Sequence, residues 1–110
     1  MTEDATLEVD LDGARRLVAE KGSKLIWLGG RPRIDIAEAL GIEGCSVEMI
    51  GPDEVYHCDG ELAERLSSSV LVCPHGNTSL FLAQHLRENF GVEAYSLRGG
   101  ISAVVGENSY

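Results

Sequence analysis

The stretch VLVCPHGNTS, residues 70–79, decides the fold and the chemistry expected of this chain. Its three leading apolar residues predict the end of a buried strand, and the polar, glycine-containing segment after them predicts a tight loop. A helix is expected to start near Thr78 or Ser79 and to end at Gly91. It is predicted to bury Leu82, Ala83, Leu86 and Phe90. The stretch therefore predicts a strand, a loop and a helix, with Cys73 at the bend.

Short apolar runs alternate with helical patterns on either side of this unit. Strands are predicted at 6–9, 25–28, 47–50, 70–72 and 94–97. Helices are predicted from Asp10 or Asp12 to Gly22, from Pro32 through Ile36, Ala37 and Leu40 to Gly41, and around Leu62, Ala63 and Leu66. Strands that alternate with helices imply an α/β domain with a mainly parallel sheet, whose sites form beyond the carboxyl ends of the strands. Cys73 falls at such an edge.

The composition is that of a single globular domain spanning residues 1–110. The chain has 110 residues, is 44% hydrophobic and carries a net charge of −9, which argues against nucleic acid as a partner. No apolar run is long enough to span a membrane, and residues 1–4 lack the features of a signal peptide, so a cytoplasmic location is expected. The spacing of the three cysteines, at 45, 58 and 73, fits no common metal or disulfide motif. Free thiols are expected, with no metal and no cofactor.

The loop around Cys73 has the features that activate a thiol. A free thiol is mostly protonated at neutral pH, but the N-terminus of a helix and inward-pointing N–H groups favour the thiolate. Gly76 can adopt backbone conformations that let the loop curl over the sulfur, so that the N–H groups of residues 75–79 form an anion nest. A lone cysteine after a buried strand is more often a packing residue. The polar loop and the helix that follow it favour a reactive one.

The same residues carry a family resemblance. Residues 73–79, CPHGNTS, resemble the active loop of rhodaneses, C-x-x-G-x-[RST]-S, and are most similar to small single-domain thiosulfate sulfurtransferases. Residues 97–103, LRGGISA, resemble the family's L-x-G-G-[IF]-x-A-W ending, with Val104 where the family has Trp. The resemblance implies a rhodanese-like α/β fold, with a five-stranded, mainly parallel sheet and helices on both faces.

The resemblance also implies a mechanism. Cys73 would take a sulfur atom from thiosulfate or another persulfide and pass it, as a persulfide, to cyanide or to the thiol of an acceptor protein. The residues expected to bind the substrate are the rest of the loop: His75, Gly76, Asn77, Thr78 and Ser79. The expected partners are therefore a small sulfur anion, a thiol acceptor protein, or both, without nucleic acid or membrane. For His75 a role in binding an anion and a merely exposed position stay open. Asn77 and Thr78 are as well suited to holding the loop's shape as to touching a ligand.

Several alternatives stay open. A cysteine phosphatase uses a similar loop, but its signature has His before the cysteine and Arg six positions after it, where this chain has Val72 and Ser79. A phosphate-accepting cysteine of a sugar transport system is a weaker alternative, because that cysteine follows the first strand. A rhodanese-fold module that binds a partner without turnover and a relay protein that passes sulfur between other proteins are further alternatives. Cys58 is a candidate for resolving the persulfide, but an unreactive thiol is favoured there, and Cys45 is expected to pack beside the sheet.

Overall fold

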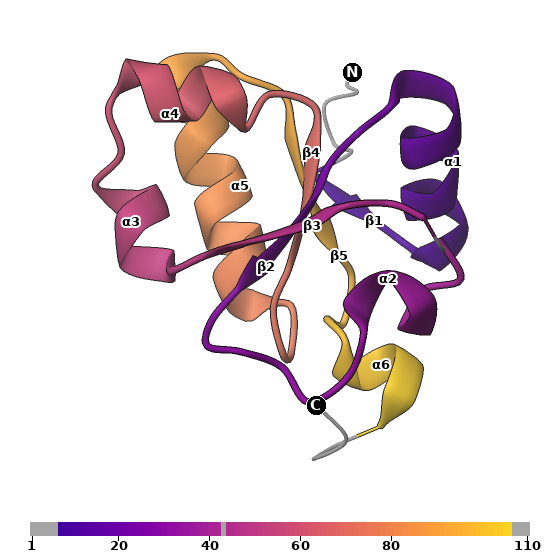
Figure 1. The fold of residues 1–110 in the computed structure, drawn as a ribbon. Coiled ribbons are helices and arrows are strands. Elements are labelled where there is room, and N and C mark those ends of the chain that lie inside the picture. Colours follow the sequence, from indigo (N-terminus) through magenta and orange to yellow (C-terminus); the bar gives the residue numbers. More distant parts are fainter. Residues whose placement is uncertain (1–6, 43, 107–110) are drawn as a thin grey trace.

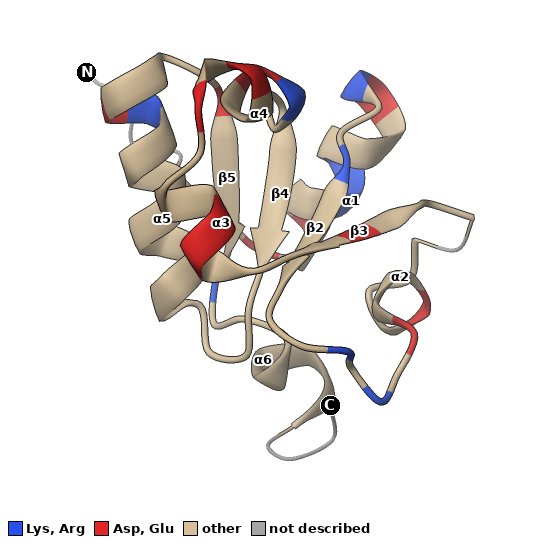
Figure 2. Ribbon diagram, turned by 60° about the vertical axis from the view of Figure 1, so that its left-hand side comes forward, with Lys and Arg blue, Asp and Glu red and all other residues tan. Residues whose placement is uncertain are grey.

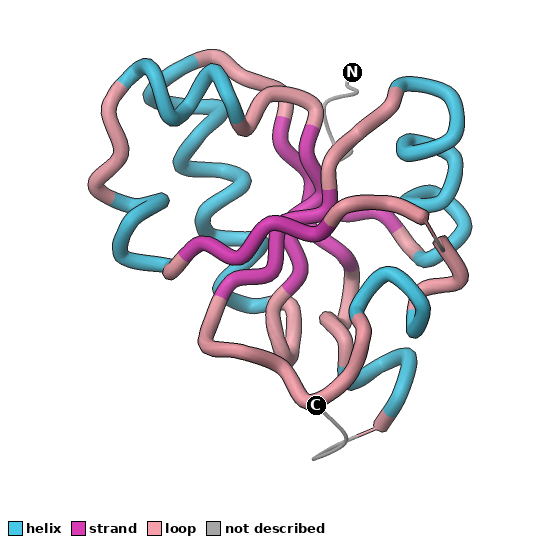
Figure 3. Tube along the Cα trace, viewed as in Figure 1, coloured by secondary structure: helices cyan, strands magenta, loops and turns pink. Residues whose placement is uncertain are grey.

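A computed structural model describes residues 7–42 and 44–106 of the chain. These residues form one parallel sheet with the order β1-β5-β4-β2-β3, in the middle of the molecule (Figure 1, Figure 3). Its strands are β1 (Glu8–Val9), β2 (Leu25–Leu28), β3 (Val47–Ile50), β4 (Ser69–Val72) and β5 (Ala94–Leu97). The predicted five-stranded parallel sheet is confirmed. Thr6, the predicted start of the first strand, lies outside the described residues.

Helices cover both faces of the sheet, as predicted. They are α1 (Leu11–Lys21), α2 (Ile36–Ala39), α3 (Pro52–Tyr56), α4 (Gly60–Arg65), α5 (Asn77–Phe90) and α6 (Ser102–Val105). In Figure 1, α3, α4 and α5 lie on one side of the sheet, and α1, α2 and α6 lie on the other. None of the helices in the described ranges is long and apolar enough to cross a bilayer.

The buried strands divide their side chains between two apolar clusters. In β4, Leu71 packs under α5, in the cluster that also holds Cys73, while Val70 and Val72 pack on the α1 side. A strand that is covered on both faces is apolar at successive positions, which explains the continuous apolar runs of β2 and β4. The alternation places Cys73, the residue after β4, on the same face as α5.

The sequence signals for α1 are confirmed in detail. The Asp10 carboxylate accepts a hydrogen bond from the Gly13 N–H at 2.8 Å, which caps the first turn. Gly22 ends the helix with φ 66, in the left-handed region that glycine adopts without strain.

Two predicted helix details are wrong. Pro32 does not lie in the first turn of α2, because Asp35 caps the helix by accepting from the Glu38 N–H at 3.2 Å, and the helical residues begin at Ile36. Phe90, predicted to be buried with the apolar stripe of α5, is 36% exposed. It is the last residue of the helix, immediately before the Gly91 cap.

Two short helices were not predicted. The Gly51-Pro52 pair ends β3, and Pro52 also occupies the first turn of α3, where its missing N–H costs no hydrogen bond. The second, α6, follows the Gly99-Gly100 turn and has four residues. Val55 is the one buried residue of α3, and α6 has none, so neither helix leaves a periodic apolar pattern in the sequence.

Candidate active site

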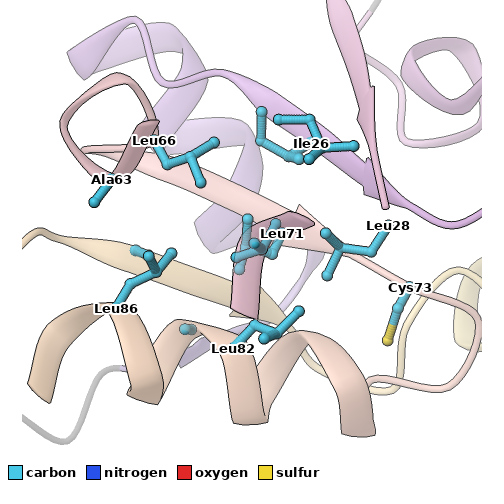
Figure 4. Close-up of a cluster of buried hydrophobic side chains, with 12 residues drawn as sticks. Ile26, Leu28, Ala63, Leu66, Leu71, Cys73, Leu82 and Leu86 are labelled. Atoms are coloured by element: carbon cyan, nitrogen blue, oxygen red, sulfur yellow. The ribbon is translucent and has the colours of Figure 1, made fainter. Parts of the chain in front are cut away.

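Cys73 lies at the carboxyl edge of the sheet, directly after the central strand β4. The residue is only 2% exposed and closes one end of the apolar cluster, beyond Leu28 and Leu82 (Figure 4). The edge position is the one where parallel sheets place their sites. Burial by itself disfavours a charged sulfur, so any anionic form needs hydrogen-bond donors from the protein.

Donors from the loop and from α5 converge on the Cys73 sulfur. The Gly76 N–H donates to Sγ at 3.1 Å, and the Ser79 N–H donates at 3.3 Å. The Ser79 hydroxyl oxygen also lies 3.3 Å from Sγ and accepts a hydrogen bond from the Cys73 thiol. Ser79 is in the first turn of α5, whose N–H groups have no acceptor within the helix. Together with the positive end of the helix dipole, these groups favour negative charge on the sulfur.

A second buried serine, Ser96, forms a hydrogen bond with Ser79. The Ser79 and Ser96 hydroxyl oxygens are 2.6 Å apart, and both residues are fully buried. The Ser79 hydroxyl can also donate to the Gly76 carbonyl at 3.3 Å. When the Ser96 hydroxyl donates to Ser79, the single hydroxyl proton of Ser79 is available for the sulfur. Ser96 thereby connects β5 to the cysteine loop.

The loop is shaped by glycine and fastened by the turn before α6. Gly76 has φ 89 and precedes α5. The carbonyl of Cys73 accepts from the Ile101 N–H at 2.9 Å, and that of Pro74 accepts from the Ser102 N–H at 3.0 Å. These bonds hold the two carbonyls toward the Gly99-Gly100 turn, whereas the Gly76 N–H of the loop faces the sulfur.

This geometry has counterparts among known structures. No protein-family model matches the chain, and neither does any curated protein sequence. A rhodanese homologue from the extremely thermophilic bacterium Thermus thermophilus is 23% identical, and the match covers 84% of this chain and 94% of that one with a TM-score of 0.56. A human single-domain sulfurtransferase is 18% identical, with coverage of 94% and 98% and a TM-score of 0.62. This chain has the rhodanese fold.

Within this rhodanese fold, the loop residues predicted from the sequence fall into two groups. Gly76 and Ser79 are buried and donate to the sulfur. His75, Asn77 and Thr78 have exposed side chains. Asn77 and Thr78 begin α5, so their N–H groups belong to the helix turn beside the cysteine. Within the described ranges, no group of three His, Cys, Asp or Glu side chains is placed to hold a metal ion.

Ser96 was not predicted as a site residue, and its replacement tests the serine pair. We expect Ser96→Ala to slow formation of the Cys73 persulfide roughly 2- to 10-fold, the effect of losing one hydrogen bond. Thiocyanate formation from thiosulfate and cyanide, per folded molecule, measures the change. Ser69→Ala is the matched control, because Ser69 is also a fully buried strand serine but donates to the Leu66 carbonyl at 2.5 Å. Equal losses in both variants would contradict a role for Ser96 at the site.

The other two cysteines of this rhodanese-fold domain make no hydrogen bond to this loop among the described residues. Cys45 packs against the apolar cluster on the α1 side, in agreement with its prediction, and its Sγ lies 3.5 Å from the Ser46 carbonyl. Cys58 packs against the α5-side cluster. Burial raises the pKa of the Cys58 thiol, and the neighbouring Asp59 carboxylate raises it further. Cys58 therefore stays protonated at neutral pH, which favours an unreactive thiol.

The raised pKa of Cys58 predicts a pH profile. Alkylation of Cys58 by iodoacetamide is expected to be slower than that of glutathione at neutral pH and to rise only in alkaline solution. Asp59→Asn is expected to move this profile to lower pH, because it removes the negative charge while asparagine can still cap α4 at the Leu62 N–H. Peptide mapping of the alkylated protein measures both effects. Rapid alkylation of Cys58 at neutral pH would contradict the assignment.

Proposed function

We propose that this protein is a sulfurtransferase that carries sulfane sulfur as a persulfide on Cys73. The observation that carries the proposal is the convergence of the Gly76 and Ser79 N–H groups on the Cys73 sulfur, with the Ser79 hydroxyl as a further hydrogen-bond partner. The rhodanese fold, which a human single-domain sulfurtransferase shares, supports it. A cysteine that served only to pack the core would not need two N–H donors at the start of a helix.

The first displacement loads the cysteine. The Cys73 thiolate attacks the outer sulfur of thiosulfate, an S–S bond forms at Sγ, and sulfite leaves with the electron pair of the broken bond. With another persulfide as donor, a thiolate leaves in place of sulfite. The N–H groups of the loop and of the first turn of α5 stabilise the charge on the new outer sulfur. Asn77 and Thr78 contribute N–H groups of that turn, and the exposed His75 side chain can contact an incoming donor anion.

The second displacement removes the sulfur atom from the Cys73 persulfide. Cyanide or the thiolate of an acceptor protein attacks the outer sulfur, and the Cys73 thiolate leaves with the bonding pair, which restores the starting state. Neither displacement transfers electrons to an external acceptor or requires a cofactor. Because the same N–H groups stabilise the thiolate and the persulfide anion, the site serves both directions.

A comparison of two activities tests this function against the phosphatase alternative. We expect transfer of sulfur from thiosulfate to cyanide and no hydrolysis of para-nitrophenyl phosphate. Ser79 stands where a phosphatase has an arginine to clamp the phosphate dianion, so the loop offers only N–H and hydroxyl donors. Both activities are measured on one preparation of wild type and of Cys73→Ser. Phosphate release that depends on Cys73, without sulfur transfer, would overturn the proposal.

The same experiment separates the catalytic proposal from a binding module. A folded wild-type protein without either activity would favour a rhodanese-fold module that binds a partner without turnover. Because backbone amides alone bind anions weakly, we expect thiosulfate to saturate the enzyme only at high concentration. A protein persulfide would then be the better donor.

A further inference from the structure

Large apolar side chains are exposed on one side of the molecule. Among the described residues, Tyr56 is 45% exposed, Phe81 56% and Phe90 36%. Tyr56 ends α3, whereas Phe81 and Phe90 lie on α5, which packs against α3. The fourth exposed residue of this kind, Met49, is in β3 and is 51% exposed. Clustered exposed aromatic side chains are typical of interaction surfaces.

The rings contact one another. Tyr56 stacks on Phe81 with ring centroids 5.8 Å apart and on His85 at 4.8 Å. Phe90 meets the His85 ring edge-on at 6.3 Å. His85 Nε2 lies 3.1 Å from the Tyr56 carbonyl oxygen, which ties α5 to α3. We call Tyr56, Phe81, His85 and Phe90 the aromatic face. Rings held in this way are preordered, so a partner that covers them loses little side-chain entropy.

The aromatic face adjoins the cysteine loop. Phe81 follows Asn77 by four positions and Thr78 by three on α5, so these exposed side chains share one face of the helix, next to the loop that holds Cys73. A hollow of about 220 Å³ lies between Phe81, Gln84, His85 and Glu88. A molecule seated on these rings therefore lies beside the start of α5, where the persulfide would form.

Acidic side chains predominate around the face, and Arg87 is the one basic residue of α5. Asp53 and Glu54 on α3, Asp59 before α4 and Glu88 on α5 are all acidic. Residues 51–64 and 73–86 contain no lysine or arginine. Figure 2 shows the acidic segment of α3 in front of α5, and the basic segment of α5 only in its last turn, at Arg87. A surface of this kind is complementary to a basic partner and repels an acidic one.

We propose that the aromatic face is the docking surface for a basic protein whose cysteine exchanges sulfur with Cys73. The proposal rests on the proposed function and names its partner. In the loading direction, the outer sulfur of the partner's persulfide forms a bond to Cys73 Sγ, and the partner's thiolate leaves with the electron pair. The outer sulfur keeps its proton. The reverse displacement returns sulfur to a partner thiolate. A small anion gains nothing from the rings, whereas a protein gains both apolar contact and charge complementarity.

Two synthetic peptides test the docking surface. They have equal length and one cysteine each, flanked by leucine and arginine in the first and by leucine and glutamate in the second. The Cys73 persulfide is formed with thiosulfate, and the rate of sulfur transfer to each peptide is measured beside the rate to cyanide. We expect the basic peptide to react about 10-fold faster or more at low salt, with a smaller difference at high salt. Equal rates for the two peptides would overturn the proposal.

Matched variants separate the aromatic face from the net charge of −9. Tyr56→Ala with Phe81→Ala is expected to slow transfer to the basic peptide about 10-fold and to leave transfer to cyanide unchanged. Met49→Ala, which removes an equally exposed side chain from β3, is expected to change neither rate. The double variant Asp53→Asn with Glu88→Gln is expected to reduce the preference for the basic peptide. Its control is the double variant Glu20→Gln with Glu38→Gln, which removes as much charge from α1 and α2 and is expected to have a smaller effect.

The outcomes distinguish the docking proposal from the sulfurtransferase function on which it rests. If transfer to cyanide is normal but the face variants and their controls have equal effects, the docking proposal is contradicted and the sulfurtransferase proposal is not. Absence of transfer to cyanide in the wild type contradicts the sulfurtransferase and the docking proposal together. Sedimentation of the wild type and of Phe81→Ala gives a further check. If the wild type is a dimer and Phe81→Ala dissociates it, the aromatic face belongs to a contact with a second copy of this chain, and the proposal is overturned.

Discussion

Replacement of Cys73 by serine is expected to abolish sulfur transfer from thiosulfate to cyanide. A serine hydroxyl is protonated at neutral pH and cannot carry a persulfide, so the loss should be roughly 10³-fold or more. The fold should persist, because a hydroxyl fits the space of the buried thiol and keeps the Gly76 and Ser79 N–H groups as neighbours. Colorimetric measurement of thiocyanate gives the rate.

The other cysteines provide the controls for this experiment. Cys45→Ala and Cys58→Ala should retain most of the activity, because both residues are partly buried at the edges of apolar clusters, away from the hydrogen bonds of the loop. Full activity of Cys73→Ser would contradict the persulfide mechanism. Loss of activity in Cys58→Ala, in a protein that is still folded, would assign a catalytic step to the second thiol.

Gly100→Ala is expected to damage both the fold and the site. Gly100 has φ 66, and a Cβ built there would overlap the Cys73 carbonyl oxygen and lie 2.5 Å from the Pro74 carbonyl oxygen and 2.6 Å from the Gly76 nitrogen. The backbone strain costs about 1–3 kcal/mol, and the overlap costs about 1–3 kcal/mol more. Relief of the overlap displaces the loop from the turn that fastens it. We therefore expect a lower free energy of unfolding and, in the molecules that stay folded, slower persulfide formation.

Gly60→Ala is the matched control for this substitution. Gly60 lies in the first turn of α4, and no heavy atom lies within 4 Å of a Cβ built there. Urea denaturation and thiocyanate formation are measured on both variants. We expect Gly60→Ala to have wild-type activity and unchanged or higher stability. Wild-type behaviour of Gly100→Ala would contradict the close packing of the cysteine loop on the Gly99-Gly100 turn.

The strand, loop and helix around Cys73 were predictable because their signals are local. An apolar run, a glycine in a polar loop and an apolar helical stripe each depend on neighbouring residues, and all three agree. The αL conformation of Gly76, with φ 89, is the conformation for which glycine was singled out. The sheet was predictable for the same reason, since strands covered on both faces stand out as apolar runs.

Ser96 was missed because its contact is not local. It meets Ser79 across 17 positions, through the packing of α5 on β5. One signal was present: in residues 94–97, AYSL, the large Tyr95 and Leu97 side chains pack on the α1 side, which leaves small Ala94 and Ser96 for the face under α5. A serine on the covered face of a buried strand requires a polar partner there.

The errors at Phe90 and Pro32 have different causes. Periodicity gives the direction of a side chain around the helix axis but not how far the neighbouring elements extend along it. Phe90 is in register with the buried stripe of α5, yet it ends the helix and rests against His85. At Pro32 the competing signal was the cap: Asp35 supplied a better helix start three residues later.

Intact-mass spectrometry after thiosulfate treatment tests the central claim most directly. The protein is reduced, incubated with thiosulfate, separated from excess reagent and weighed, and the modified residue is then mapped in peptides. The account predicts one added sulfur atom, located on Cys73, absent from Cys73→Ser and removed by cyanide with release of thiocyanate. An unchanged mass in a folded wild-type protein, or an added sulfur on Cys45 or Cys58 that persists in Cys73→Ser, would contradict it.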